Sequence, residues 1–179
     1  MRNLALFAAL AASLMLTAVP ANAQAVQTGA GKLDKSGWTD AASAQGAYSV
    51  RLPCLFDEQL MVAKPNSLAV KSFNLECTQA DGTLFRAMRV EFNGGAGPAQ
   101  DFFVRMQTFG GNHVLRAFKS GGNDAVDLKN EKDDHCAWTR QIRAGADNLM
   151  LIVEHTGTRC ATLQPDVTKF FDSIVVKPR

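Results

Sequence analysis

Two histidines and two cysteines near the end of the chain are residues that could bind zinc. Thiolates and imidazoles are common zinc ligands, and His135, Cys136, His155 and Cys160 offer two of each. His135 and Cys136 are adjacent, however, and adjacent residues on a β-strand point to opposite faces of the sheet. The spacing therefore favours a disulfide over a metal site, and we expect no bound metal and no cofactor.

The number of cysteines supports this interpretation. An even count in an exported chain is typical of disulfides, and Cys54, Cys77, Cys136 and Cys160 allow three pairings. A predicted hairpin favours Cys136–Cys160, because its two arms bring these residues close together. Cys54–Cys77 then follows mainly by elimination. With all four cysteines paired, no thiolate remains for a Cys–His nucleophile.

Two other patterns could indicate an active or binding site. The segment Gly94–Pro98 leads into a predicted helix, where anions can bind, but it lacks the Gly-Lys-Ser/Thr ending of a phosphate loop. We therefore interpret it as a flexible connection. Acidic residues in loops would be the first candidates for a hydrolase, although nothing in their spacing selects them. These residues are Asp57, Glu58, Asp133 and Asp134.

Several arginines are distributed over the predicted strands. Arg86, Arg89, Arg140 and Arg143 are candidates for binding an acidic partner if they gather on one sheet face. The alternative is that they are solvated and paired with nearby carboxylates.

The start of the chain predicts export. Arg2 precedes an apolar run from Leu4 to Val19, and Ala21-Asn22-Ala23 has the small residues of a cleavage site. The apolar run has 16 residues, fewer than the roughly 20 that span a bilayer. We expect cleavage near Ala23 and a periplasmic or secreted product that is not inserted in a membrane. Loss of Arg2 lowers the net charge from +2 to +1, which argues against nucleic acid as a partner.

After this signal peptide (residues 1–23) we predict a flexible leader over 24–37 and one α+β domain over 38–179. Apolar periodicity predicts a mostly antiparallel sheet of about six or seven strands with two amphipathic helices packed on it. The helices should start near Pro98 and Pro165 and bury Phe102, Phe103 and Phe170. The strands cover residues 48–52, 70–78, 84–92, 113–119, 126–128, 134–142 and 149–156.

Two short motifs carry a resemblance to a known family. Trp38 with Gly46–Pro53 near the start of the domain, and Lys169–Ile174 at its end, resemble the boundaries of the PsbP/Mog1-like domain. The resemblance implies an antiparallel sheet between helical layers. It also implies an accessory or partner-binding role, because the family has no shared catalytic residues. We therefore expect a non-catalytic exported module that binds a partner protein or an envelope component. The alternative is a periplasmic hydrolase that uses the acidic loop residues.

Overall fold

The computed structural model describes residues 22–178, so most of the predicted signal peptide lies outside the described residues. The helices are α1 (Ala96–Thr108), the short 3-10 helix η1 (Thr158–Ala161) and α2 (Gln164–Asp172). The strands are β1 (Asn22–Ala30), β2 (Thr39–Ser43), β3 (Tyr48–Leu52), β4 (Phe56–Val62), β5 (Ala69–Thr78), β6 (Leu84–Phe92), β7 (His113–Ser120), β8 (Asn123–Lys132), β9 (His135–Ala144), β10 (Asp147–Thr156) and β11 (Val175–Val176).

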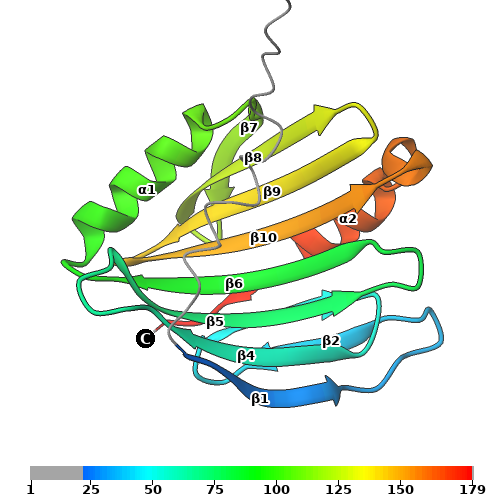
Figure 1. Cartoon of the computed structure of the whole chain (residues 1–179), viewed down its shortest axis with the longest axis horizontal. Helices are drawn as coiled ribbons and strands as arrows, with labels where there is room; N and C mark the ends of the chain where they lie inside the picture. Colours follow the sequence, from blue (N-terminus) through cyan, green and yellow to red (C-terminus); the bar gives the residue numbers. More distant parts are fainter. Residues whose placement is uncertain (1–21, 179) are drawn as a thin grey trace, which may run out of the picture.

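The strands form two antiparallel sheets. The large sheet has eight strands in the order β1-β4-β5-β6-β10-β9-β8-β7, and the small sheet has the order β11-β3-β2. Figure 1 shows the large sheet nearly face-on, with α1 crossing one end of it and with β2 and α2 behind it. We call the side of the large sheet that faces α1 the outer face, and the side that faces α2 and the small sheet the inner face.

The predicted architecture is wrong in its number of strands and in how its layers are built. The described residues contain eleven strands rather than six or seven, and a second sheet takes much of the place expected for helices. Residues 55–67, which belong to none of the predicted strands, contain β4, whose Asp-Glu-Gln run hides its alternation. The predicted leader at 24–37 contains most of β1, which pairs with β4. The protein is therefore mostly β, with helices covering only part of each face.

The main core lies between the inner face, the small sheet and α2. Alternation on β9 and β10 sends Trp138, Leu149 and Leu151 inward, where Tyr48 of β3 and Phe170 of α2 pack against them. The Tyr48 hydroxyl lies 2.8 Å from two carbonyl oxygens of the large sheet, and burial together with the charge of Glu58 raises the pKa of this phenol. These contacts join the two sheets.

Two disulfides reinforce the same layer. Cys54–Cys77 connects the end of β3 to β5, and Cys136–Cys160 connects β9 to η1, each with a Cα–Cα distance of 5.8 Å. This is the pairing that the sequence favoured among the three possible ones. The first bond links the small sheet to the large one, and the second fixes the segment that leads into α2.

Candidate functional site

The outer face carries an apolar groove beside α1. Met88, Val90, Met150 and Ile152 project from β6 and β10 and form its buried floor, whereas α1 covers them only in part. The cavity has a volume of about 350 Å³, which is within the range of small-molecule sites. We call it the α1 groove.

Helix α1 leaves this space open because it packs shallowly. Only Ala99 is fully buried on this helix, whereas Phe102 and Phe103 are partly exposed, so the predicted burial of these two phenylalanines is wrong. Phe102 packs against Phe92 of β6 with ring centroids 5.3 Å apart. Its other side and Met106 face the groove. In α2, by contrast, Phe170 is buried as predicted.

Glycines at both ends determine the position of α1. Gly94 and Gly95 before the helix, and Gly110 and Gly111 after it, have φ between 54° and 86°, a region that side chains with a Cβ rarely adopt. The helix has no side-chain N-cap, and the segment Gly94–Pro98 joins β6 to its first turn. Both ends of α1 can therefore turn sharply back toward the sheet.

A few polar contacts hold α1 on the sheet. Asn148 Nδ2 donates to the carbonyl oxygen of Ala99 at 3.0 Å, and Asn130 Nδ2 donates to that of Gly110 at 2.8 Å. Beneath the helix, Gln141 is fully buried on β9, yet neither of its amide atoms has a hydrogen-bond partner among the described residues. An unsatisfied buried amide is unfavourable, so Gln141 lowers the stability of the layer between α1 and the sheet.

Methionine is the most distinctive residue of the groove. Met61, Met88, Met106 and Met150 line it, which is four of the six methionines in the chain. The unbranched, polarizable thioether side chain adapts to ligands of different shape, and methionine is common on such surfaces. The groove is therefore suited to an apolar ligand and has few groups that could impose a specific hydrogen-bond pattern.

Charged groups occur near opposite ends of the groove. Lys71 lines the end formed by the β4–β5 hairpin, and Lys64 belongs to the loop of that hairpin. Glu154 lines the other end, on β10. Within residues 22–178 neither Lys64 nor Glu154 forms an ion pair.

The four arginines named from the sequence do not form one patch. Arg86 and Arg143 lie on the outer face, where Arg86 pairs with Glu76 at 2.8 Å and Arg143 bonds to Gln100 of α1. Arg89 and Arg140 lie on the inner face, and their side chains are only 5% and 4% exposed. Arg89 pairs with Asp147 at 2.9 Å. These two buried arginines present little surface to a partner.

Arg140 is the centre of a buried ion-pair network. It bonds both oxygens of Asp127, at 2.7 and 2.9 Å, and its Nη1 reaches Asp172 at 3.0 Å. Its guanidinium stacks on the rings of Phe118 and Phe171. Burial lowers the pKa of Arg140, but hydrogen bonds and charges from the two carboxylates outweigh burial and raise it. This network attaches α2 to the inner face.

The acidic residues considered for a hydrolase are dispersed. Asp57 and Glu58 are adjacent on β4 and point to opposite faces, and Glu58 is buried against Ser43. Asp133 and Asp134 lie in the β8–β9 turn, four strand spacings from β4 at roughly 19 Å across the sheet. These four carboxylates cannot act on one bond.

The candidate zinc ligands are likewise separated. Cys136 and Cys160 are bonded to each other, and His135 lies on the face opposite Cys136. His155 is buried, with its Nδ1 3.0 Å from the hydroxyl of Thr83. Among the described residues, no cluster of three or more His, Cys, Asp or Glu is arranged to hold a metal.

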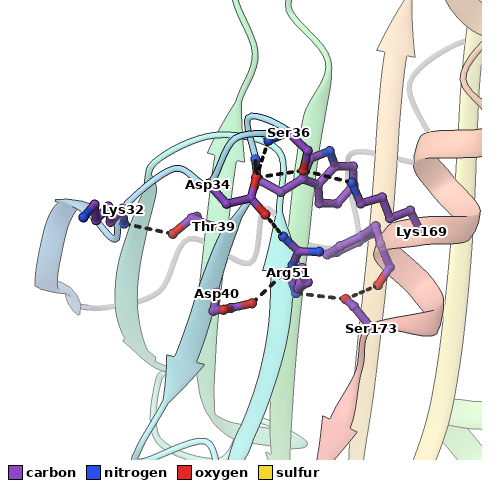
Figure 2. A network of polar contacts seen from close by, with 10 residues as sticks. Lys32, Asp34, Ser36, Thr39, Asp40, Arg51, Lys169 and Ser173 are labelled. Atoms are coloured by element: carbon purple, nitrogen blue, oxygen red, sulfur yellow. Dashed lines mark hydrogen bonds and ion pairs between the residues drawn. The ribbon is translucent and has the colours of Figure 1, made fainter.

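A second polar network joins the segment before β2 to β3 and α2 and stabilises the start of the domain (Figure 2). Asp34 accepts hydrogen bonds from Ser36 and from the backbone of Trp38, and it pairs with Arg51 of β3. These contacts hold the pKa of Asp34 well below its ordinary value. Lys169 of α2 lies over the Trp38 ring, 4.2 Å from its centroid. The network connects the start of the domain to β3 and α2.

The groove could not be identified from the sequence. Alternation correctly places Met88 and Val90 on one face of β6, but an apolar face usually indicates a closed core. What opens the groove is the shallow position of α1, which depends on its glycine turns and on its contacts with Asn148 and Asn130.

Comparison with known proteins finds a likeness among solved structures. No protein-family model matches the chain, and no curated protein matches it. Among solved structures, it is similar to the solution structure of cyanobacterial PsbP (CyanoP) from Synechocystis sp. PCC 6803. The two share 12% sequence identity, the match covers 83% of this chain and 98% of that one, and the TM-score is 0.49. The likeness transfers no activity, partner or residue role to this chain.

Proposed function

We propose that this protein is a non-catalytic binding module that acts outside the cytoplasm and takes up a partner protein or an envelope component through the α1 groove. The observation that supports it is the groove itself, an open cavity of about 350 Å³ with a floor of methionine and branched aliphatic side chains. Large apolar cavities that remain open to solvent are typical of binding sites.

The chemistry of the lining supports binding rather than catalysis. Lys71 and Glu154 are the ionisable residues among those that line the groove, and they lie near its opposite ends. General acid–base or nucleophilic catalysis needs two or more such groups within hydrogen-bond distance of one substrate. No helix between residues 22 and 178 combines the length and apolar character needed to cross a membrane.

Site-specific photocrosslinking in the native envelope tests the proposal. A photoreactive amino acid at Leu68, which lines the groove and is 42% exposed, should give one defined adduct. The same residue at Val175 of β11, which is 55% exposed and lies in the small sheet, is the matched control. Ser72→Trp, which fills the groove, should abolish the Leu68 adduct. Equal adducts from both positions, or none from Leu68, would contradict the proposal.

A further inference from the structure

We infer that the ligand of the α1 groove is a single-chain amphiphile with a positively charged amine, and that Glu154 binds this amine. The inference rests on the proposed function and specifies the ligand of the same site. Three features of the groove carry it: its length, the bonded backbone of its floor, and the hydrogen-bond acceptors at the end where α1 stops.

The groove is long and narrow. Ala69 lines one end and lies opposite Phe92 in the register of β5 and β6, whereas Glu154 lines the other end and lies opposite Leu84 in the register of β10 and β6. Positions 84 and 92 of β6 are eight residues apart, which corresponds to roughly 26 Å at the rise of a strand. A cavity of about 350 Å³ that extends over this length suits one extended chain better than a compact molecule.

The floor of the groove favours an alkyl chain over a peptide. It is the face of a sheet, so the backbone groups of β6 and β10 are already bonded to neighbouring strands. A peptide in this position would bury its N–H and C=O groups against Met88, Met150 and Ile152 without partners, which is unfavourable. An alkyl chain has no groups of this kind, and the burial of each methylene is favourable.

Hydrogen-bond acceptors gather at the end of the groove where α1 stops. Asn112 Nδ2 donates to the carbonyl oxygen of Met106 at 2.8 Å, and Asn130 Nδ2 donates to that of Gly110 at 2.8 Å. Both asparagines line the groove, and their amide oxygens are the atoms that they offer to a ligand. The C-terminal end of a helix also carries a partial negative charge. This end of the groove therefore favours a cationic group that donates hydrogen bonds.

Glu154 adds a full negative charge at the same end. Asn130, Ala137 and Glu154 lie side by side on β8, β9 and β10, so two strand spacings, roughly 10 Å, separate Asn130 from Glu154. The small side chain of Ala137 leaves space between them. Glu154 is partly exposed and forms no ion pair in the described part of the chain. An ammonium group above Ala137 is therefore placed to bind the carboxylate of Glu154 and the amide oxygen of Asn130.

The basic residues near Glu154 leave its carboxylate available to a ligand. Arg86 of β6 pairs with Glu76 at 2.8 Å. Lys132 and His135, which lie opposite each other on β8 and β9, are outside the lining of the groove. The head of the amphiphile therefore lies at the Glu154 end, and its alkyl chain extends along the floor of the groove away from this end.

Calorimetric titration of the full chain with three ligands, each below its micelle concentration, tests the inference. The ligands are dodecylammonium, dodecanoate and uncharged monododecanoylglycerol. We expect dodecylammonium to bind saturably, with one molecule per chain, about two- to fivefold more tightly than dodecanoate. The full chain has a formal net charge of +2, so its overall charge alone would favour dodecanoate instead. Ethylammonium, which has the head without the chain, should show no measurable binding.

Neutralising Glu154 distinguishes binding of the head from binding of the alkyl chain. Glu154→Gln should weaken dodecylammonium binding by about two- to fivefold, as expected for a partly exposed ion pair, and should leave monododecanoylglycerol binding unchanged. Asp101→Asn removes the same charge at an exposed position of α1 outside the groove lining and should have no effect.

Filling the groove tests the position of the alkyl chain. Ser72 lies opposite Met61 and Val90, so Ser72→Trp places an indole on the floor of the groove. This variant should weaken the binding of dodecylammonium and of monododecanoylglycerol by about tenfold or more. Because Glu154 is partly exposed and has no ion pair among the described residues, Glu154→Gln remains informative even if Ser72→Trp does not fold.

Three outcomes would overturn the inference. One is that dodecylammonium fails to bind, another is that dodecanoate binds as tightly or more tightly, and the third is that Glu154→Gln binds dodecylammonium as well as the wild type does. If the Leu68 adduct forms while dodecylammonium does not bind, the proposed function stands and only the assignment of a cationic amphiphile fails.

Discussion

The amide of Asn148 on β10 donates to the carbonyl oxygen of Ala99 at 3.0 Å and fastens the first turns of α1 to the outer face. Asn148→Asp replaces this donor with a carboxylate that faces the carbonyl oxygen. We expect a loss of about 1–3 kcal/mol in the free energy of unfolding, because a buried acceptor and a buried charge are left without partners.

Hydrogen exchange gives the local measurement for this variant. Amides in residues 96–108 should exchange faster in Asn148→Asp than in the wild type, whereas those of β3 and α2 should keep their protection. Uniform loss of protection throughout the chain would show that Asn148 supports the whole fold rather than α1.

The second prediction concerns the unpaired amide beneath α1. Gln141 is fully buried, and its Oε1 and Nε2 have no partners among residues 22–178. Gln141→Met keeps the length of the side chain and removes both polar atoms, so we expect the protein to become more stable by about 1–3 kcal/mol. Urea denaturation measures the change. A lower unfolding midpoint would mean that the amide has a partner, such as a buried water.

The sequence predicts which side of a strand a residue lies on better than it predicts how the sheets and helices stack on one another. Alternation correctly places Cys136, Trp138 and Ile142 on one side of β9 and Met88 and Val90 on one side of β6, because side chains on a strand alternate strictly. The stripe of α2 is also correct, since Pro165 sets its start and Phe170 is buried.

The strands that were not predicted lack such a signal. β4 carries Asp57, Glu58 and Gln59 in a row, and its buried Glu58 is satisfied by Ser43 of β2, a contact that only the folded chain reveals. The depth at which a helix packs is likewise a property of the whole structure. The amphipathic pattern of α1 indicates which side faces the sheet, but not that only Ala99 is fully buried there.

The third prediction compares two phenylalanines that the sequence pattern predicts to be equally buried. Phe170 is fully buried and makes an edge contact with Phe85 at a centroid distance of 5.5 Å, whereas Phe103 on α1 is partly exposed. Phe170→Ala should lower stability by about 3–5 kcal/mol. Phe103→Ala should have a clearly smaller effect, as measured by urea unfolding. Equal losses for both variants would contradict the shallow packing of α1.

The fourth prediction concerns acid stability. Burial raises the pKa of Asp81, but hydrogen bonds from Thr83 and the charge of Arg159 outweigh it and lower the pKa from 3.8 to about 2. The folded state therefore gains stability from ionised Asp81 above pH 3.8, and this gain is lost as the pH falls from 3.8 toward 2.

Asp81→Asn removes this titration. The thermal midpoint of the variant should fall less steeply than that of the wild type over this acid range, and the two curves should run parallel near neutral pH. Asp101→Asn, at an exposed position on α1, is the control and should keep the wild-type slope. Identical slopes for the wild type and Asp81→Asn would contradict the lowered pKa.

The last prediction distinguishes the net contribution of a buried ion pair to the free energy of unfolding from the cost of removing only one of its two partners. Arg140 and Asp127 have side chains that are 4% and 9% exposed, and they bond through two hydrogen bonds. Arg140→Met leaves Asp127 buried with only the exposed Arg116 as an ionic partner, and we expect a loss of about 3–5 kcal/mol. Adding Asp127→Leu removes the uncompensated carboxylate and should restore a large part of this loss. Urea unfolding of the wild type, Arg140→Met, Asp127→Leu and the double variant gives a double-mutant cycle, which measures the interaction energy of the pair. If the double variant is less stable than Arg140→Met alone, Asp127 contributes through groups other than Arg140, and the proposed centre of the network is wrong.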